Sequence, residues 1–248
     1  MYIKRKIEDT ILNISSTFPV LMLTGPRQSG KTTLLERLSA THRKYVTLDD
    51  PEDRLFAKNE PVSFLERYSP PVIIDEIQYA PELFPYIKMY VDRHKNSGDF
   101  WLTGSQMFHM MKNVSESLAG RVGIVNLFGL SNNEIFGTLF DQYTTEKDEL
   151  LKRIQIAKPM TLPDVFERIF KGGMPRIYEQ PNVNQEEYYS SYVQTYLSRD
   201  IKELTQVADE LAFYKFLCVA AAHTGTMVIY AALAKEVEIS APTAKQWL

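Results

Sequence analysis

Gly25-Pro26-Arg27-Gln28-Ser29-Gly30-Lys31-Thr32 is the stretch of sequence that decides the fold. It matches the pattern G-x-x-x-x-G-K-[ST] at every fixed position. The apolar run Val20–Leu23 before it predicts a buried strand, and residues 32–40 after it predict a helix. A glycine-rich loop between a strand and a helix is the context in which this pattern binds phosphate.

The physical reason lies in the backbone of the loop. Glycines let the chain curl so that several amide groups point inward at phosphate oxygens, and the helix adds the positive end of its dipole. We expect Lys31 to reach the β- and γ-phosphates and the Thr32 hydroxyl to bind Mg²⁺. The residues predicted to bind the nucleotide are Gly25, Pro26, Arg27, Gln28, Ser29, Gly30, Lys31, Thr32 and Thr33.

A second motif is the apolar run Val72–Ile74 followed by Asp75 and Glu76. A buried strand that ends in acidic residues places carboxylates at the carboxyl edge of a parallel sheet, where ligands bind. We expect Asp75 to hold Mg²⁺, directly or through its water, and Glu76 to deprotonate an attacking water. This pair favours hydrolysis over transfer to a metabolite. The sequence has no N-K-x-D motif for guanine, so ATP is the expected nucleotide.

Leu102-Thr103-Gly104-Ser105-Gln106 ends the next predicted strand. In a parallel sheet this end lies near the end of the Asp75 strand. Thr103 or Ser105 is therefore a candidate ligand of the γ-phosphate or of the attacking water, with Ser105 taken as catalytic. The alternative is that the hydroxyl only caps the following helix.

Arg121 follows the predicted helix 106–118 and precedes the apolar run Val122–Phe128. From that position it could extend out of its own subunit toward the γ-phosphate of a neighbour, which would imply a homo-oligomer. The alternative is a surface arginine that pairs with the C-terminus of the helix.

Strands that alternate with helices predict an α/β fold, a P-loop NTPase parallel sheet with helices on both faces. Within it, 4–17 reads as an amphipathic helix. Capping patterns mark helix starts at Asp50-Pro51 and at Ser131. We predict a nucleotide-binding domain at 1–140, a linker and helical lid at 141–205, and an incomplete winged helix-turn-helix at 206–248.

The C-terminal third reads as helices. Tyr188, Tyr192 and Tyr196 lie four apart on one face, which favours a packing stripe over a base-stacking platform. Residues 231–235 and a helix from Ala241 predict a helix-turn-helix that binds DNA or packs on a neighbour. Its only basic residues are Lys235 and Lys245, which favours packing.

Composition sets further bounds. A net charge of -3 over 248 residues gives no global attraction to nucleic acid or anionic lipid. No apolar run reaches the length of a signal peptide or a transmembrane helix, so we expect a cytoplasmic protein without membrane contact. The single cysteine, Cys218, lies in the apolar stretch 216–222 and is expected to be a small buried side chain.

Taken together, the chain resembles the bacterial and archaeal AAA+-superfamily (STAND-like) ATPases. In these a nucleotide domain precedes a winged helix and a C-terminal domain of unknown function. The segments that carry the resemblance are GPRQSGKTTLL (25–35), TLDDP (47–51), IIDEIQYAPELF (73–84), FWLTGSQ (100–106), ESLAGRV (116–122), GGMPR (172–176) and YLSRDI (196–201).

The resemblance implies an ATP hydrolase that uses ATP and Mg²⁺, with Lys31, Thr32, Asp75 and Glu76 at its centre. It supports Arg121 as a residue that acts on a neighbouring subunit. It places Gly172–Arg176 in a helical lid, from which Arg176 would approach the nucleotide. Such proteins usually run well beyond this length, so we expect the chain to be part of a longer protein.

Three functions follow as hypotheses. The first is an ATPase that acts as a nucleotide-driven switch in a larger assembly. The second is a nucleotide-gated DNA-binding regulator with little turnover, which predicts salt-sensitive duplex binding. The third is a small-molecule kinase, which would transfer phosphate to a metabolite and not to water.

Overall fold

The computed structural model describes residues 2–39, 43–105, 114, 117–138, 143–157, 159–180, 182–196 and 209–248. The chain forms two compact units, Met1–Val183 and Asn184–Leu248. The three-part division drawn from the sequence stays a prediction. The first unit contains the sheet and the phosphate loop, and the second is helical in its described residues.

The sheet of the first unit has five parallel strands within the described residues, in the order β2-β3-β4-β1-β5. Their bounds are β1 Val20–Thr24, β2 Lys44–Thr47, β3 Val72–Asp75, β4 Phe100–Gly104 and β5 Val122–Asn126. Strand β4 lies between β1 and β3, so the strand that precedes the phosphate loop is not hydrogen-bonded to the strand that ends in Asp75. The predicted α/β class is confirmed.

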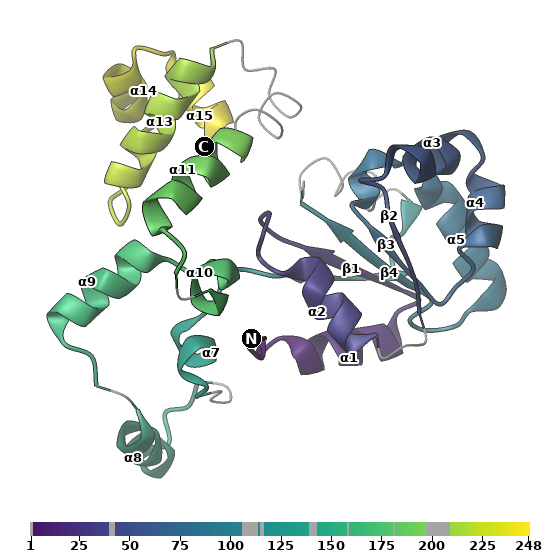
Figure 1. Ribbon diagram of the computed structural model, residues 1–248, viewed down its shortest axis with the longest axis horizontal. Helices are drawn as coiled ribbons and strands as arrows, with labels where there is room; N and C mark the ends of the chain where they lie inside the picture. Colours follow the sequence, from purple (N-terminus) through teal and green to yellow (C-terminus); the bar gives the residue numbers. More distant parts are fainter. Residues whose placement is uncertain are drawn as a thin grey trace. The chain divides into compact units, whose positions relative to one another are not determined.

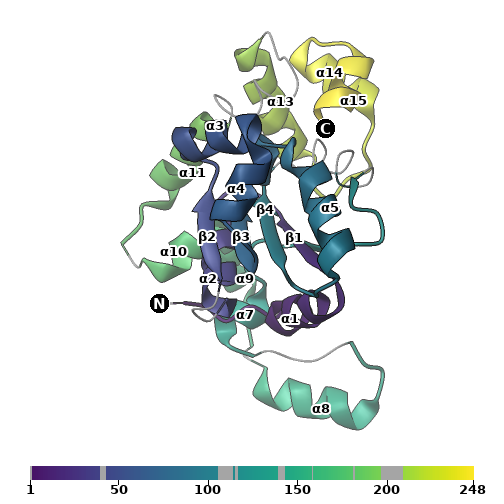
Figure 2. The same ribbon diagram turned by 90° about the vertical axis from the view of Figure 1, so that its right-hand side faces the viewer.

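Helices cover both faces of this sheet (Figure 1). On one face lie α1 (Glu8–Thr17) and α2 (Lys31–Leu38). On the other lie α3 (Pro51–Asn59), α4 (Pro61–Arg67) and α5 (Leu83–His94), and Figure 2 views the sheet from the side of α4 and α5. The short 3-10 helix η1 (Ile77–Tyr79) follows β3.

Side-chain alternation along β1 explains why both faces are covered. Val20 and Met22 belong to the core with α4 and α5, whereas Leu21 and Leu23 belong to the core with α1 and α2. All four are at most 1% exposed. A strand buried on both faces needs apolar residues at successive positions, which is the pattern that the sequence shows.

The first helix begins later than its amphipathic pattern suggests, at Glu8 and not at residue 4. The preceding backbone amides are satisfied by carboxylates. The amide of Arg5 donates to Glu8 Oε1 at 2.8 Å, and the amide of Lys6 donates to Glu134 Oε1 at 2.9 Å. Glu134 lies 128 residues beyond Lys6, so only the Glu8 contact, three residues from Arg5, could be found from local sequence.

The two predicted helix starts are confirmed. Asp50 caps α3 by accepting from the amides of Glu52 and Asp53, with proline at the first helical position. Ser131 and Glu134 form a reciprocal capping box at α7 (Asn132–Phe136). The described residues of the first unit also form α8 (Lys147–Ile156), α9 (Leu162–Lys171) and α10 (Pro175–Glu179).

The second unit contains α11 (Gln185–Tyr196), α13 (Glu210–Ala222), α14 (Tyr230–Val237) and α15 (Ala241–Trp247). Its core joins Phe216 to α14, and Trp247 packs edge-on against Phe213 and Phe216. The two helices predicted from residues 231–248 are therefore present.

Cys218 corrects an expectation, because it is exposed and not buried. Helix α13 is apolar around much of its circumference, and α14 and α15 cover the face that bears Phe213 and Phe216. The tyrosine stripe is present on α11, where the rings of Tyr192 and Tyr196 stack with centroids 6.4 Å apart. Most of the helix predicted at 106–118 lies outside the described residues.

Candidate nucleotide-binding site

The phosphate loop connects β1 to α2 and adopts backbone conformations that its sequence permits. Gly25 has φ +146° and Gly30, the residue before α2, has φ +90°. A side chain on Gly25 would also collide with the Leu127 carbonyl oxygen, which lies 2.1 Å from the position of a Cβ. Gln28, with φ +59°, adopts the same left-handed region without being glycine. Both fixed glycines are thus needed for the curl of the loop.

Lys31 is the buried cation of this loop. It is 6% exposed, and its Nζ donates to the carbonyl oxygens of Gly25 and Pro26 at 3.0 and 2.9 Å. The ammonium therefore lies over the inside of the loop, where phosphate oxygens can take the place of the two carbonyls.

Thr32 and Asp75, the two residues predicted to hold Mg²⁺, lie side by side. The Thr32 hydroxyl lies 3.0 and 3.1 Å from the two carboxylate oxygens of Asp75, which is 7% exposed. Thr103 Oγ1 also donates to Asp75 Oδ1. A hydroxyl and a carboxylate side by side are hard oxygen donors, and Mg²⁺ is commonly bound by one or two such ligands together with waters and phosphates. The donor set therefore fits magnesium.

Glu76 follows β3 in the left-handed region, with φ 57° and ψ 46°, a conformation that costs a non-glycine residue roughly 1–2 kcal/mol. Its backbone amide donates to Thr103 Oγ1 at 3.1 Å. Its carboxylate accepts from Gln78 Nε2 and lies 3.4 Å from Ser105 Oγ. The structure thus brings Asp75, Glu76, Thr103 and Ser105 to one edge of the sheet, as predicted.

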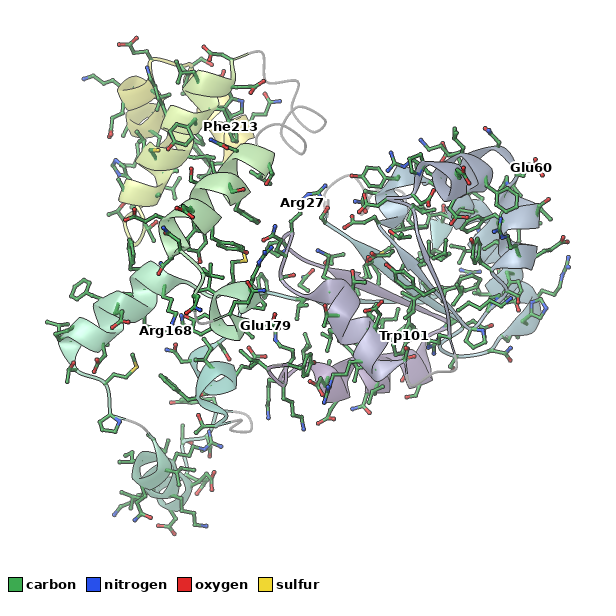
Figure 3. All side chains as sticks on the ribbon, in the orientation of Figure 1. Arg27, Glu60, Trp101, Arg168, Glu179 and Phe213 are labelled. Atoms are coloured by element: carbon green, nitrogen blue, oxygen red, sulfur yellow. The ribbon has the colours of Figure 1, made fainter. Side chains whose placement is uncertain are left out.

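The other predicted loop residues differ in exposure. Ser29 is fully buried, and its hydroxyl has no hydrogen-bond partner within the described residues. Arg27 Nη2 lies 3.4 Å from the Tyr79 hydroxyl, and Figure 3 labels Arg27 at the loop. Pro26, Gln28 and Thr33 are exposed, Thr33 on the outer side of α2. Their roles as nucleotide ligands stay predictions.

Arg121 lies at the other end of the sheet, directly before β5, whereas the phosphate loop follows the carboxyl end of β1. It forms a bidentate ion pair with Asp92 of α5, with Nη2 3.0 Å from Oδ2, and Nη1 donates to the Ala119 carbonyl. The hydrogen bond from Arg121 lowers the pKa of Asp92. Arg121 is thus remote from the loop of its own chain.

Two site residues were missed by the sequence reasoning. The Tyr45 hydroxyl donates to Asp75 Oδ2 at 3.1 Å, and burial raises the pKa of this tyrosine, helped by the Asp75 charge. Gln78 contacts both Glu76 and Ser105. Gln78 lies two positions after Glu76, so its closeness to the motif in the sequence could have pointed to it. Tyr45 comes from β2, and no neighbouring residue in the sequence links it to Asp75.

A buried ion pair lies next to the phosphate loop. Arg5 Nε lies 3.0 Å from Glu134 Oε1, and the side chains are 6% and 7% exposed. Burial by itself would raise the pKa of Glu134. The amides of Ser131 and Lys6 and the Arg5 charge outweigh it and hold that pKa below its ordinary value of 4.5. Glu134 is therefore a carboxylate at neutral pH.

This ion pair leads to a prediction about how the free energy of unfolding changes at acid pH. The contribution of Glu134 is complete above pH 4.5 and is lost as the pH falls through the lower pKa of the folded chain. We expect Glu134→Gln to destabilise the chain by about 3–5 kcal/mol at neutral pH, because it leaves Arg5 buried without a counter-charge. In thermal unfolding from pH 7 to 3, the difference from wild type should shrink below pH 4.5.

Glu149→Gln is the matched control, since Glu149 pairs with Arg153 one helical turn away and is 45% exposed. It should change stability by at most about 0.5 kcal/mol at any pH. An acid profile of Glu134→Gln that runs parallel to wild type would contradict the assignment.

Helices α9 and α10, residues 162–179, are here called the α9–α10 hairpin, and the start of α10 lies beside the phosphate loop. Leu130 N donates to the Gly173 carbonyl at 2.6 Å, and a Cβ on Gly30 would lie 3.9 Å from Pro175 Cγ. Arg168 of α9, labelled in Figure 3, hydrogen-bonds Tyr178 of α10. Arg176 is exposed, and its approach to a nucleotide stays a prediction.

A glycine loop between a parallel strand and a helix, next to an acidic strand end, defines a P-loop nucleotide-binding protein. Residues 17–136 match the family described as an AAA domain. Residues 17–136 are therefore similar to AAA-type P-loop domains. Residues 162–248 match a second family, described as a domain of unknown function. The winged helix stays a prediction.

Two curated relatives are similar over 233 residues at 30% identity, one from Mycobacterium tuberculosis and one from Mycobacterium bovis, both called uncharacterized proteins. The match covers 93% of this chain and 47% of each relative. The chain thus spans about half the length of the curated relatives it matches.

Among solved structures, a Walker-type ATPase of Pyrococcus abyssi has a similar fold, with a TM-score of 0.52 and 15% identity. The match covers 96% of this chain and 89% of that one. This likeness supports the fold. Within the described residues, no helix combines the length and the apolar character needed to cross a membrane.

Proposed function

We propose that this chain binds ATP with Mg²⁺ and hydrolyses it, as a nucleotide-driven switch. The observation that carries the proposal is the 3.0 Å contact between Thr32 of the phosphate loop and Asp75 of β3. This contact supports a metal site beside the loop that would hold the triphosphate and next to Glu76, the carboxylate that would activate water.

Binding of the triphosphate rests on the loop. The first amides of α2 have no partner inside the helix, and the helix dipole favours an anion at this end. The ammonium of Lys31 is already buried, so little of its desolvation cost remains when phosphate oxygens replace the Gly25 and Pro26 carbonyls. Thr32 and Asp75 would hold Mg²⁺, which supplies neutralisation of phosphate charge when bound.

Hydrolysis rests on Glu76. Its carboxylate would accept a proton from water as the water oxygen bonds to the γ-phosphorus, while the bond to the β–γ bridging oxygen breaks and ADP leaves. Ser105 and Gln78 hold this carboxylate beside the end of β4. Thr103 contacts both Asp75 and the Glu76 amide, so it links the metal ligand to the base.

The switch rests on the α9–α10 hairpin. Pro175 lies next to Gly30, so a phosphate that moves the loop also moves the surface against which α10 packs. A change in the loop can therefore alter the position of α10 through direct contact.

The test is a calorimetric titration of the chain with ATP, with and without Mg²⁺, followed by a phosphate-release assay. We expect saturable binding that Mg²⁺ strengthens, and release of inorganic phosphate in proportion to ADP. No heat of binding, or ATP that stays intact over many hours, would overturn the proposal. Label found on an added metabolite and not in free phosphate would favour the kinase.

We further propose that Arg121 acts on the ATP of a neighbouring subunit. It lies away from its own phosphate loop and is 33% exposed beside Asp92. An arginine supplied in trans is worth roughly 10³–10⁵ in rate.

We expect Arg121→Ala to turn over ATP at least about 100-fold more slowly, and to recover activity when mixed with Lys31→Ala. The first variant keeps an intact loop and the second keeps an intact Arg121, so only a shared site allows rescue. A normal rate for Arg121→Ala alone would show that Arg121 serves only its ion pair with Asp92.

A further inference from the structure

Arg5 is a buried arginine outside the motifs that define the nucleotide site. It precedes α1, is 6% exposed, and lies behind the phosphate loop. Burying a guanidinium is costly unless its donors are satisfied, so the identity of its partners shows which parts of the fold it connects.

Those partners come from two segments. Nη1 donates to the Ser29 carbonyl in the phosphate loop at 3.0 Å. Nη2 donates to the Phe128 carbonyl at 2.7 Å, with Gly129 O at 3.4 Å, and Nε donates to Glu134. One planar cation thus joins the loop before α2 to the segment that follows β5.

The segment after β5 also contacts the α9–α10 hairpin. Leu130 N donates to the Gly173 carbonyl, and a Cβ on Gly129 would lie 2.8 Å from that same oxygen. Arg168 of α9 adds a hydrogen bond to Asn132 at 2.8 Å. Close backbone contact and a side-chain anchor thus fix the hairpin to the residues that Arg5 binds.

The hairpin also contacts the phosphate loop directly, because Pro175 lies beside Gly30. The phosphate loop therefore meets the hairpin twice, directly at Pro175 and through Arg5 and residues 128–130. Ser29 and Gly30 are adjacent in the loop, so a displacement of this corner changes both contacts together.

We propose that Arg5 is a positioning residue that couples the phosphate loop to the α9–α10 hairpin. It holds the Ser29 carbonyl in the nucleotide-ready loop and transmits the state of the loop to residues 172–180. The inference rests on the proposed binding of ATP. It assigns Arg5 no contact with substrate, because each of its three guanidinium nitrogens donates to a protein oxygen.

The test compares Arg5→Met and Arg5→Lys with wild type, in the same chain. Affinity is measured by calorimetric titration with MgATP, and hydrogen exchange of residues 172–180 is measured with and without saturating MgATP. Arg43→Met is the matched control. Arg43 is also a largely buried arginine that donates to a backbone carbonyl, that of Gly98, but it stacks on Trp101 of β4 away from the loop.

In wild type, MgATP should slow exchange at residues 172–180. Arg5→Met should bind ATP about tenfold more weakly, and at saturation the change in exchange should be reduced to the part that the direct contact at Pro175 transmits. Arg5→Lys should bind with intermediate affinity, since one ammonium cannot donate to both segments in the fork geometry of a guanidinium. Arg43→Met should lose stability and keep both the affinity and the exchange response.

An unchanged exchange response in ATP-saturated Arg5→Met would overturn the inference and leave the proposed function intact. A wild type that binds ATP without any change at residues 172–180 would do the same. No ATP binding by folded wild type would overturn the proposed function itself. If Arg5→Met does not fold, Arg5→Lys decides: a wild-type exchange response overturns the coupling, and a reduced response supports it.

Discussion

Lys31→Ala is expected to weaken ATP binding by at least about 100-fold and to abolish turnover. The ammonium would donate to two phosphate oxygens, and charge-assisted hydrogen bonds contribute about 1.5–3 kcal/mol each. Since 1.4 kcal/mol is a factor of ten, loss of two such bonds exceeds two orders of magnitude. Calorimetric titration with MgATP and a phosphate-release assay measure the two effects.

Lys44→Ala is the control for loss of a lysine. Lys44 also donates to a backbone carbonyl and a hydroxyl, those of Arg67 and Ser69, at the start of β2 and away from the loop. Its removal should leave affinity and turnover within about twofold of wild type. If Lys31→Ala hydrolysed ATP as fast as Lys44→Ala, the loop would not be the phosphate site.

Glu76→Gln is expected to leave ATP binding intact and to slow hydrolysis by about 10²–10⁴, the range that a positioned general base contributes. Glutamine has the same shape, so Ser105 can still donate to its carbonyl oxygen, but the amide does not accept a proton from water. Single-turnover measurement with labelled ATP separates the two steps. ATP should remain bound and uncleaved.

The control is Glu82→Gln, at an exposed glutamate just before α5. It should bind and hydrolyse ATP as wild type does. Weakened binding without slowed cleavage in Glu76→Gln would assign Glu76 to the metal or to the loop. Hydrolysis at more than half the wild-type rate would remove it as the base.

Local patterns predicted much of the site. The loop, the helix after it and the acidic end of β3 are each set by residues within a few positions of one another. The same holds for the caps at Asp50 and Ser131. Turn geometry, capping and side-chain periodicity act over three or four residues, so these features can be read without the fold.

Predictions from the sequence were wrong where contacts between distant residues outweigh local patterns. The pattern of 4–17 predicts a helix from residue 4, but α1 begins only at Glu8, and Glu134 accepts the amide of Lys6 before that start. The apolar surroundings of Cys218 suggest burial, yet the side chain lies on the part of α13 that α14 and α15 do not cover. Burial depends on which face of a helix meets a partner, which sequence periodicity does not specify for a helix apolar on several sides.

The sequence by itself determined that a phosphate loop follows one strand and that two carboxylates follow another. Only the tertiary structure decided that β4 lies between those strands, that Tyr45 reaches Asp75, and that Arg5 joins the loop to the segment after β5. The physical reason is distance along the chain. Arg5 and Glu134 are 129 residues apart, and such contacts arise from strand order and core packing, which no neighbouring residue encodes.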